Sequence, residues 1–407
     1  ILKNKLFPFY RTKEAKLLFF ILQENGKQTS KFVGGCVRKY FSNDLIDDLD
    51  IATELPPEIV KDKIKSHNLK VYDTGIEHGT VTVIINKKKF EITTLRRDVK
   101  TFGRHAEVSF TNDWFEDSKR RDFTINSIYL DHKGNVFDPH NGMTDLKNKK
   151  IRFIGNIDQR IEEDYLRILR YLRFFSNYSK LNHDLELKKV IKKNINGISH
   201  VSSERLLDEF KKIFNSNSIK KLFEDDFSLE IIRLIFPQFK NLQILKNLNN
   251  FGKKNLQNID FCFLLSLLII DETDNSDYFV YKFNISKKYQ RRILIIKDFF
   301  YKNKENQKIN TQELWKVFYK YGKESLNDIL NYKLFISKKV DKKIINYLKF
   351  FDEKSIPIFP IKGEDLMKKF GIPQGKKVGE NLKLVEDYWI KNNFKISDKE
   401  LEKIVKN

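Results

Sequence analysis

The sequence contains few cysteines and no long apolar run. Its 407 residues include only Cys36 and Cys262, which are too few and too far apart for a disulfide framework or a zinc cluster. The most apolar stretch, residues 261–270, is about half as long as a bilayer-spanning helix, so we expect it to be a buried helix. The N-terminus lacks the pattern of a secretion signal. We therefore expect a soluble, cytoplasmic protein that does not bind a membrane.

Acidic residues are also in short supply relative to basic ones. The chain has 55 Asp and Glu against 77 Lys and Arg, a formal net charge of +22. Such a surplus is typical of proteins that bind a polyanion such as nucleic acid. Abundant Lys, Ile, Asn and Phe are equally typical of an AT-rich genome, so charge alone leaves an ordinary lysine-rich surface as the alternative.

Glycine and proline are scarce over one long region, and this divides the chain. Residues 1–151 hold nearly all the strand signals, which read KFVGG, LDIAT, GTVTVIIN, KFEITTL and TINSIYLD. Residues 152–355 show helical periodicity with almost no Gly or Pro. A proline-bearing break at 354–363 precedes a last helical module. We predict an α/β domain followed by helical domains.

Two glycines follow the first predicted strand. Gly34 and Gly35 stand between KFV and a helical segment, where backbone N–H groups could approach phosphate oxygens without a Cβ in the way. Arg38, one turn into that helix, could add a charged donor to the same phosphates. An ordinary glycine turn is the simpler interpretation of this motif taken alone.

Three acids on two predicted strands indicate metal chemistry. Asp48 and Asp50 are two residues apart in DDLDIAT, so both side chains point to one face. Adjacent carboxylates repel each other and are most easily held by a divalent cation. Glu91, in FEITTL, could supply a third carboxylate from a neighbouring strand. This set suits two-metal nucleotidyl transfer, although an exposed acidic turn is the alternative.

A basic segment, KRRDFTINSIYLD (119–131), follows a stretch (95–110) whose polar, glycine-broken character predicts a mobile loop. We predict that Arg121 contacts a triphosphate or a sugar and that Asp122 pairs with a basic neighbour.

Several segments occur here in the order found in class II, or bacterial-type, tRNA nucleotidyltransferases and poly(A) polymerases. They read GGCVRK…DLD, TGIEHGTVTV…FEITTLRRD, GRHAEVSF, RRDFTIN, DPHNGMTDLKNKKIRFIG and RIEEDYLRILRYLRF. The sequence resembles this family densely over residues 30–215. Afterwards the resemblance is confined to GEDLMKKFGIPQGKKVGENL, which is similar to the family's tail.

The resemblance implies a seahorse-like protein with a polymerase-β-type nucleotidyltransferase head over residues 1–151. An all-α neck (152–215), body (216–355) and tail (356–407) would follow, the neck selecting the nucleotide and the tail binding tRNA. The implied activity is Mg²⁺-dependent, two-metal addition of CCA to the 3′ end of tRNA from CTP and ATP, without a nucleic-acid template. No stable protein partner can be inferred.

The resemblance also implies roles for individual residues. Asp48 and Asp50 would bind metal, with Glu91 as the third catalytic acid. The implied nucleotide-binding residues are Gly34, Gly35, Arg38, Arg121, Asp164, Arg167, Arg170 and Arg173.

The proposed selectivity has a chemical basis in EEDYLRILRYLR (162–173), which we expect to lie on one helix. C and A present an amino donor beside a ring acceptor, whereas U and G present a carbonyl beside a ring N–H. A carboxylate and a guanidinium at i and i+3, such as Asp164 and Arg167, match C and A and penalise U and G. The alternative is a surface salt bridge from Glu163 or Asp164 to Arg167, worth under about 1 kcal/mol.

Two departures from the family pattern and several competing functions remain. Lys39 stands where an acid is usual, and Asn43 replaces a common glycine, which Asn tolerates because it adopts positive φ.

Poly(A) polymerase is the nearest competing function, but VYDTGIEHGTVTV resembles CCA-adding members, and the intact loop argues against CC-only addition. A hydrolase based on His183 and Asp184 lacks further histidines after residue 200. A non-catalytic RNA-binding protein would be expected to lose a metal ligand.

Overall fold

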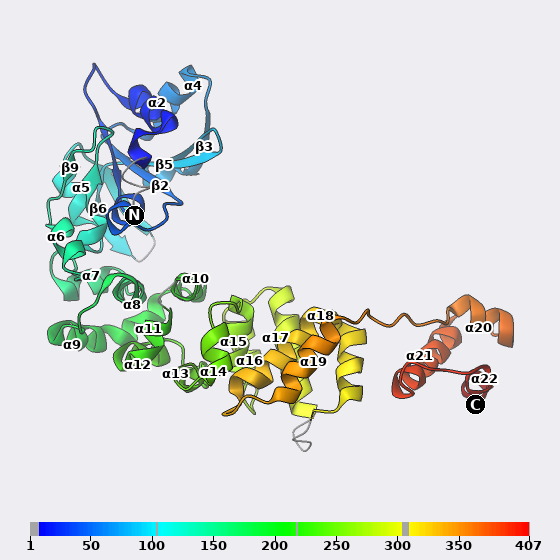
Figure 1. Cartoon of the computed structure of the whole chain (residues 1–407). Helices are drawn as coiled ribbons and strands as arrows, with labels where there is room; N and C mark the ends of the chain where they lie inside the picture. The colour runs from blue at the N-terminus through cyan, green and yellow to red at the C-terminus, as the bar shows by residue number, and fades with distance from the viewer. Residues whose placement is uncertain (1–7, 103–104, 217–218, 303–308, 407) are drawn as a thin grey trace. The chain divides into compact units, whose positions relative to one another are not determined.

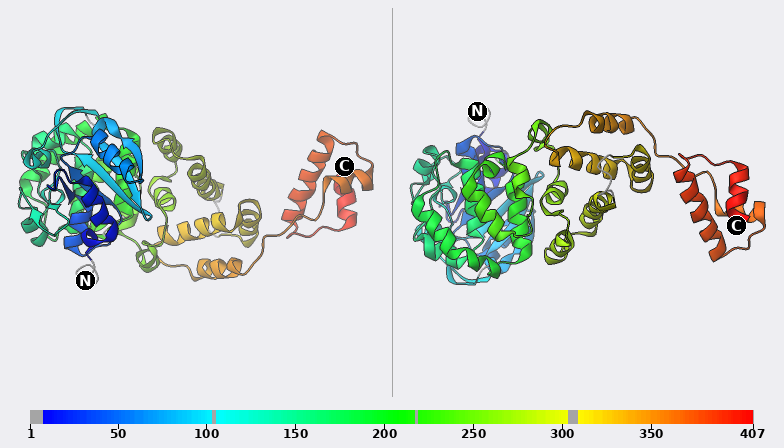
Figure 2. Two further views of the ribbon diagram at one scale, coloured as in Figure 1. Left: turned by 90° about the horizontal axis from the view of Figure 1, so that it is seen from above. Right: turned by 90° about the horizontal axis from the view of Figure 1, so that it is seen from below.

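The computed structural model describes residues 8–102, 105–216, 219–302 and 309–406, and the chain forms two compact units, Ile1–Phe236 and Pro237–Asn407 (Figure 1). Every strand among these residues lies in the first unit, and the described part of the second is helical (Figures 1 and 2). The predicted division into head, neck, body and tail is finer than this, and its boundaries stay predictions. No described helix has the length and apolar character needed to cross a membrane.

A mixed sheet of seven strands forms the centre of the first unit, in the order β3-β4-β5-β2-β1-β8-β9. The strands β2 and β5 pair in parallel, and the other neighbours are antiparallel. This arrangement confirms the predicted α/β head. The strands are β1 (Ser30–Val33), β2 (Leu49–Thr53), β3 (Lys70–Gly75), β4 (Thr80–Ile85), β5 (Lys88–Thr94), β8 (Tyr129–Leu130) and β9 (Val136–Phe137).

Side-chain alternation sets the two faces of this sheet. On β5, Phe90 and Ile92 are buried, which leaves Glu91 half-buried on the opposite face. Helix α3 (Gly35–Ser42) packs on β1 and β2, whereas α4 (Pro57–Ser66) packs on β3 and β4 and against α2 (Lys13–Leu22). The core of the head therefore orients one row of polar side chains away from itself.

Two segments of the head differ from the sequence prediction. TINSIYLD, predicted as a strand, begins with a 3₁₀ turn, η3 (Thr124–Asn126), and contributes only β8 to the sheet. Residues 95–110, predicted as a loop, form the antiparallel pair β6 (Arg96–Phe102) and β7 (His105–Phe110). A two-stranded ribbon pairs its own backbone groups without joining the large sheet, so polar composition did not reveal it.

The rest of the first unit is helical. On α8 the apolar stripe Ile168, Leu169 and Leu172 is fully buried, and Phe174 contacts Phe123 of the head with ring centroids 5.2 Å apart. The helices are α5 (Trp114–Lys119), α6 (Gly142–Lys147), α7 (Ile157–Glu163), α8 (Arg167–Tyr178), α9 (Leu185–Asn194), α10 (Ser203–Phe214), α11 (Ile219–Glu224) and α12 (Asp226–Ile235), with a 3₁₀ turn, η4 (Ile195–His200).

The second unit is one compact group of helices, in which Tyr319 of α18 packs on Trp389 of α21. The apolar stretch predicted to be buried forms α15, whose residues are all buried, and α18 breaks at Gly322, where φ is 82°. The last three helices pack around Leu366, Val385 and Leu401. The helices are α13 (Leu242–Lys246), α14 (Asn250–Asn255), α15 (Phe261–Ile269), α16 (Asn275–Lys282), α17 (Lys287–Lys302), α18 (Thr311–Ile336), α19 (Lys342–Asp352), α20 (Gly363–Phe370), α21 (Lys376–Lys391) and α22 (Asp398–Lys406).

Candidate active site

The two glycines form the turn between β1 and α3, as predicted. Gly34 has φ 72°, a conformation that side chains with a Cβ rarely adopt. A Cβ there would lie 3.7 Å from Asp50 Oδ2 and 3.8 Å from Arg121 Nη1, so this backbone passes close to both groups. At the other end of α3, Asn43 has φ 60°, as expected from its tolerance of positive φ, and Lys39 pairs with Asp47.

The predicted acids lie on or next to two neighbouring central strands of the sheet, β2 and β5. Asp50 is directly opposite Glu91 in the parallel β2–β5 ladder, and Asp48 immediately precedes β2. Burial, together with the charges of Glu91 and Asp48, raises the pKa of Asp50 to about 6, although Arg121 acts in the opposite direction. Among the described residues nothing donates a hydrogen bond to the Asp50 carboxylate, so its negative charge lacks a direct partner.

The carboxylate groups of these acids are suitable ligands for a cation, but the three side chains do not point to one common position. Within the described residues, no group of three or more His, Cys, Asp or Glu side chains is placed to hold a metal ion. Glu91 instead forms an ion pair with Lys89. Asp48 and Asp50 supply carboxylate oxygens, the ligands that Mg²⁺ prefers, and their mutual repulsion would be relieved by a positive ion.

Arg121 is fixed by an acid that sequence reasoning missed. Its Nη2 lies 3.2 Å from Asp117 Oδ2, its Nε donates to the Tyr129 hydroxyl at 3.1 Å, and Arg120 Nε pairs with Asp117 Oδ1 at 2.8 Å. Burial raises the pKa of Asp117, but Arg120 and Arg121 outweigh it and lower that pKa to about 2. The i, i+3 and i, i+4 spacing in DSKRR was the available signal.

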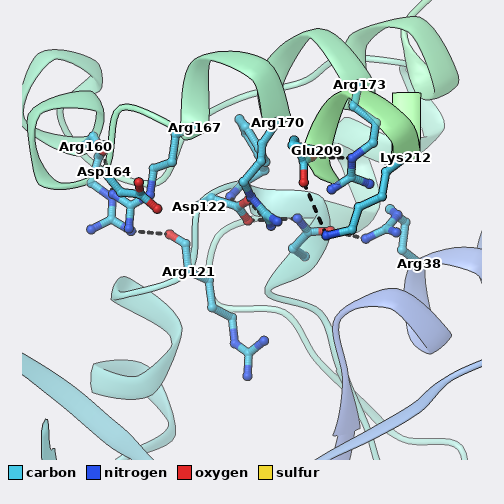
Figure 3. Close-up of polar contacts among 12 residues, drawn as sticks. Arg38, Arg121, Asp122, Arg160, Asp164, Arg167, Arg170, Arg173, Glu209 and Lys212 are labelled. Carbon is cyan, nitrogen blue, oxygen red and sulfur yellow. Dashed lines mark hydrogen bonds and ion pairs between the residues drawn. The ribbon is translucent and has the colours of Figure 1, made fainter. Parts of the chain in front are cut away.

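A chain of polar contacts joins the head to helix α8 (Figure 3). Arg170 donates from Nε to Asp122 Oδ2 at 2.8 Å, which confirms that Asp122 pairs with a basic residue. Asn126 donates from Nδ2 to Asp122 Oδ1 at 2.8 Å and accepts from Arg38 through Oδ1. Arg38 is buried, and its guanidinium lies over the Phe174 ring. Arg38 and Arg170 are therefore linked through two side chains.

The predicted single helix over EEDYLRILRYLR is wrong. Helix α7 ends at Glu163, Asp164 is extended with φ −155° and ψ 101°, and α8 begins at Arg167. The expected i, i+3 pairing within a helix therefore does not occur. Tyr165 turns out of the helical path and stacks on His200, with centroids 5.8 Å apart. This contact between distant segments carries no local sequence signal.

Asp164 and Arg167 have separate partners in the structure. Asp164 Oδ2 accepts from Arg205 Nη2 at 2.8 Å, and Arg167 Nη1 donates to Glu163 Oε2 and to the Arg160 carbonyl, each at 2.6 Å. The alternative Glu163–Arg167 ion pair is thus present. The Nε and Nη2 donors of Arg167 have no acceptor among the described residues, and they remain available to a ligand.

Arg173 lies further along α8 beside a cavity of about 720 Å³. Its Nε is 2.5 Å from Glu209 Oε1 on α10. The cavity is also lined by Gly35, Arg38, Asp48 and Asp50. The structure therefore brings Arg173 together with the predicted turn and metal ligands, whereas Asp164, Arg167, Arg170, Glu91 and Arg121 lie outside its lining.

His183 is a core residue. Its Nδ1 is 2.8 Å from the Tyr171 hydroxyl, its Nε2 is 2.8 Å from Asp225 Oδ2, and Asp184 caps α9. Both ring nitrogens are thus engaged, which removes the basis for the hydrolase alternative.

Comparisons with known proteins identify the family of this chain. A model of the poly A polymerase head domain matches residues 30–152, and one of a probable RNA and SrmB-binding site of polymerase A matches residues 183–243. Human mitochondrial CCA tRNA nucleotidyltransferase 1 is 34% identical over 397 residues, which cover 92% of this chain and 86% of the human protein. The chain belongs to the CCA tRNA nucleotidyltransferase family.

Solved structures of CCA-adding enzymes share the fold of this family member. The Bacillus stearothermophilus enzyme in complex with CTP has a TM-score of 0.73 at 24% identity, covering 94% of this chain and 93% of its own. The Thermotoga maritima enzyme complexed with tRNA has a TM-score of 0.64 at 19% identity, covering 97% and 96%. The predicted family, fold class and enzyme class, a nucleotidyltransferase, are confirmed. The family uses a divalent metal ion.

Proposed function

We propose that this chain adds C, C and A in sequence to the 3′ end of tRNA, using CTP and ATP and no nucleic-acid template. The observation that carries the proposal is a pair of groups beside the head, the Asp164 carboxylate and the unused donors of Arg167. Together they offer an acceptor and a donor to the edges of C and A. Sequence identity to the human CCA tRNA nucleotidyltransferase over most of the chain supports the same activity.

The other predicted residues receive roles that follow from their surroundings. Asp48 and Asp50 would hold Mg²⁺, with Glu91 the nearest further acid. When bound, two such ions activate the 3′-hydroxyl and neutralise the leaving pyrophosphate. The N–H groups of the Gly34–Gly35 turn, with Arg38 and Arg121, would bind the triphosphate.

On the neck side, Arg170 and Arg173 would bind the incoming nucleotide from α8.

We keep the cytoplasm as the proposed compartment, although the human relative is named as mitochondrial. Cell fractionation would decide between the two compartments.

The test is incubation with tRNA that lacks its 3′ CCA, with each nucleoside triphosphate singly and all four together, followed by sequencing of the products. CCA ends in the full mixture, and C alone from CTP, are the expected result. Long A tracts would favour poly(A) synthesis, and no incorporation would favour a non-catalytic RNA-binding protein.

A substitution tests the metal ligands separately. Asp48→Ala should abolish incorporation at any Mg²⁺ concentration while tRNA binding, measured by filter retention, is kept. Asp62→Ala, an exposed acid on α4, is the matched control and should behave as the unaltered chain. Retained activity in Asp48→Ala would refute the metal assignment.

A further inference from the structure

One lysine that the sequence reading did not single out, Lys212 on α10, lines the same cavity as the predicted metal ligands. The cavity has two facing sides. Gly35, Arg38 and Asp50 lie on the head side, and Arg173, Asn177 and Lys212 lie on the side of α8 and α10. Lys212 and Asp50 therefore line the same cavity from opposite sides.

The charged residues of the cavity lining are divided between its two sides: its four acids, Asp44, Asp47, Asp48 and Asp50, all lie on the head side, whereas the charged residues that line it from α8 and α10 are Arg173 and Lys212. Figure 3 shows Arg38, Arg173 and Lys212 directed toward one another. Glu209 is the acid between the last two, with Oε1 2.5 Å from Arg173 Nε and Oε2 3.5 Å from Lys212 Nζ. One carboxylate is thus shared by two cations, and a third cation lies across the cavity. An anion placed there would relieve their repulsion.

The two cations that contact Glu209 differ in how much of each side chain is exposed. The Glu209 side chain is 1% exposed and that of Arg173 is 15% exposed, whereas that of Lys212 is 61% exposed. The long contact between an exposed ammonium and Glu209 contributes little to stability. Lys212 thus retains donors that can reach a ligand, and buried Glu209 limits where its ammonium can lie.

On the basis of the proposed function, we propose that Lys212 is a phosphate-binding residue of the active site and that Glu209 is its positioning residue. A lysine ammonium binds phosphate oxygens as a compact point charge with three donors. The phosphate has two possible sources, the triphosphate of the incoming nucleotide and the phosphodiester backbone at the tRNA 3′ end. Both must come close to Asp48 and Asp50 for transfer to occur.

Steady-state kinetics of C addition distinguish these sources. Lys212→Met keeps the apolar stem and removes the charge, and it should raise one KM about tenfold. A rise in the KM for CTP assigns the contact to the triphosphate, and a rise in the KM for tRNA assigns it to the phosphodiester backbone. Lys212→Arg should restore most of the loss.

A neighbouring lysine gives the matched control. Lys211 is also exposed on α10 but does not line the cavity, so Lys211→Met should leave both KM values within about twofold. Glu209→Gln, which keeps the shape and removes the charge, should raise the same KM as Lys212→Met. Thermal unfolding followed by circular dichroism would identify a variant that fails to fold.

The outcome that overturns the inference is a Lys212→Met chain with both KM values unchanged while the unaltered chain adds C normally. An equal effect in Lys211→Met would overturn it too, because the cavity would then be irrelevant. If the unaltered chain incorporates no nucleotide, it is the proposed function that fails.

Discussion

At the scale of single residues, Asp122 shows how one carboxylate can join two parts of the first unit. It accepts hydrogen bonds from Arg170 on α8 and from Asn126 in the head. Burial raises its pKa, but Arg170 and Asn126 outweigh burial and lower that pKa to about 2. The sequence predicted that Asp122 has a basic partner, but the identity of that partner depends on a contact 48 residues away.

Asp122→Asn should therefore destabilise the chain. Breaking a buried ion pair typically costs about 3–5 kcal/mol, and because Arg170 is partly exposed we expect about 2 kcal/mol. The folded-state pKa lies below the ordinary value, so this stability is present above about pH 4 and is lost as pH falls toward 2. Urea unfolding of both chains between pH 2 and 7 is the measurement. Asp62→Asn is the control, and equal stability of Asp122→Asn at pH 7 would contradict the assignment.

Asp164 permits a second prediction at this scale. Asp164→Asn replaces one acceptor oxygen by a donor while keeping the size of the side chain, so it should weaken the preference for C over U by roughly tenfold and slow C addition less. Competition between CTP and UTP in primer extension measures this. Glu162→Gln, an exposed neighbour on α7, should retain the preference. An Asp164→Asn chain with unaltered selectivity would remove Asp164 from the selecting pair.

At the scale of elements, the sequence pattern predicted the strands and helices whose formation depends on residues close together in the chain. Alternation and turn residues placed β1, β2, β4 and β5. Periodicity cannot detect a break that tertiary contacts impose, so α7 and α8 were predicted as one helix. The same limit applies to the site. Glu91 was predicted as a third acid, but its position opposite Asp50 depends on sheet register. The pairing of Asp117 with Arg121 was missed although its spacing was readable, because spacing alone does not show that Asp117 is buried.

The break before α8 gives a prediction about an element. A Cβ on Gly197 of η4 would lie 2.0 Å from Tyr165 Cε1, so Gly197→Ala must displace this ring, which belongs to the break between α7 and α8. We expect a loss of about 1–3 kcal/mol in the free energy of unfolding, together with slower C addition. Gly379→Ala, inside α21 with open space around it, should be neutral or slightly stabilising. Unaltered activity and stability in Gly197→Ala would mean that the break does not depend on Tyr165.

At the scale of the whole molecule, the net charge of +22 predicts that salt affects the binding of the two substrates of the proposed reaction to different extents. A tRNA presents many phosphates and releases many counterions when bound, whereas CTP presents one triphosphate. The KM for tRNA should therefore rise at least about tenfold between 50 and 200 mM salt, and the KM for CTP should change much less. Lys376→Glu tests the same point in the second unit, because this lysine is 92% exposed at the start of α21. That variant should raise only the KM for tRNA and flatten its salt dependence. If salt changed both KM values equally, the surplus charge would be an ordinary lysine-rich surface, the alternative that composition left open.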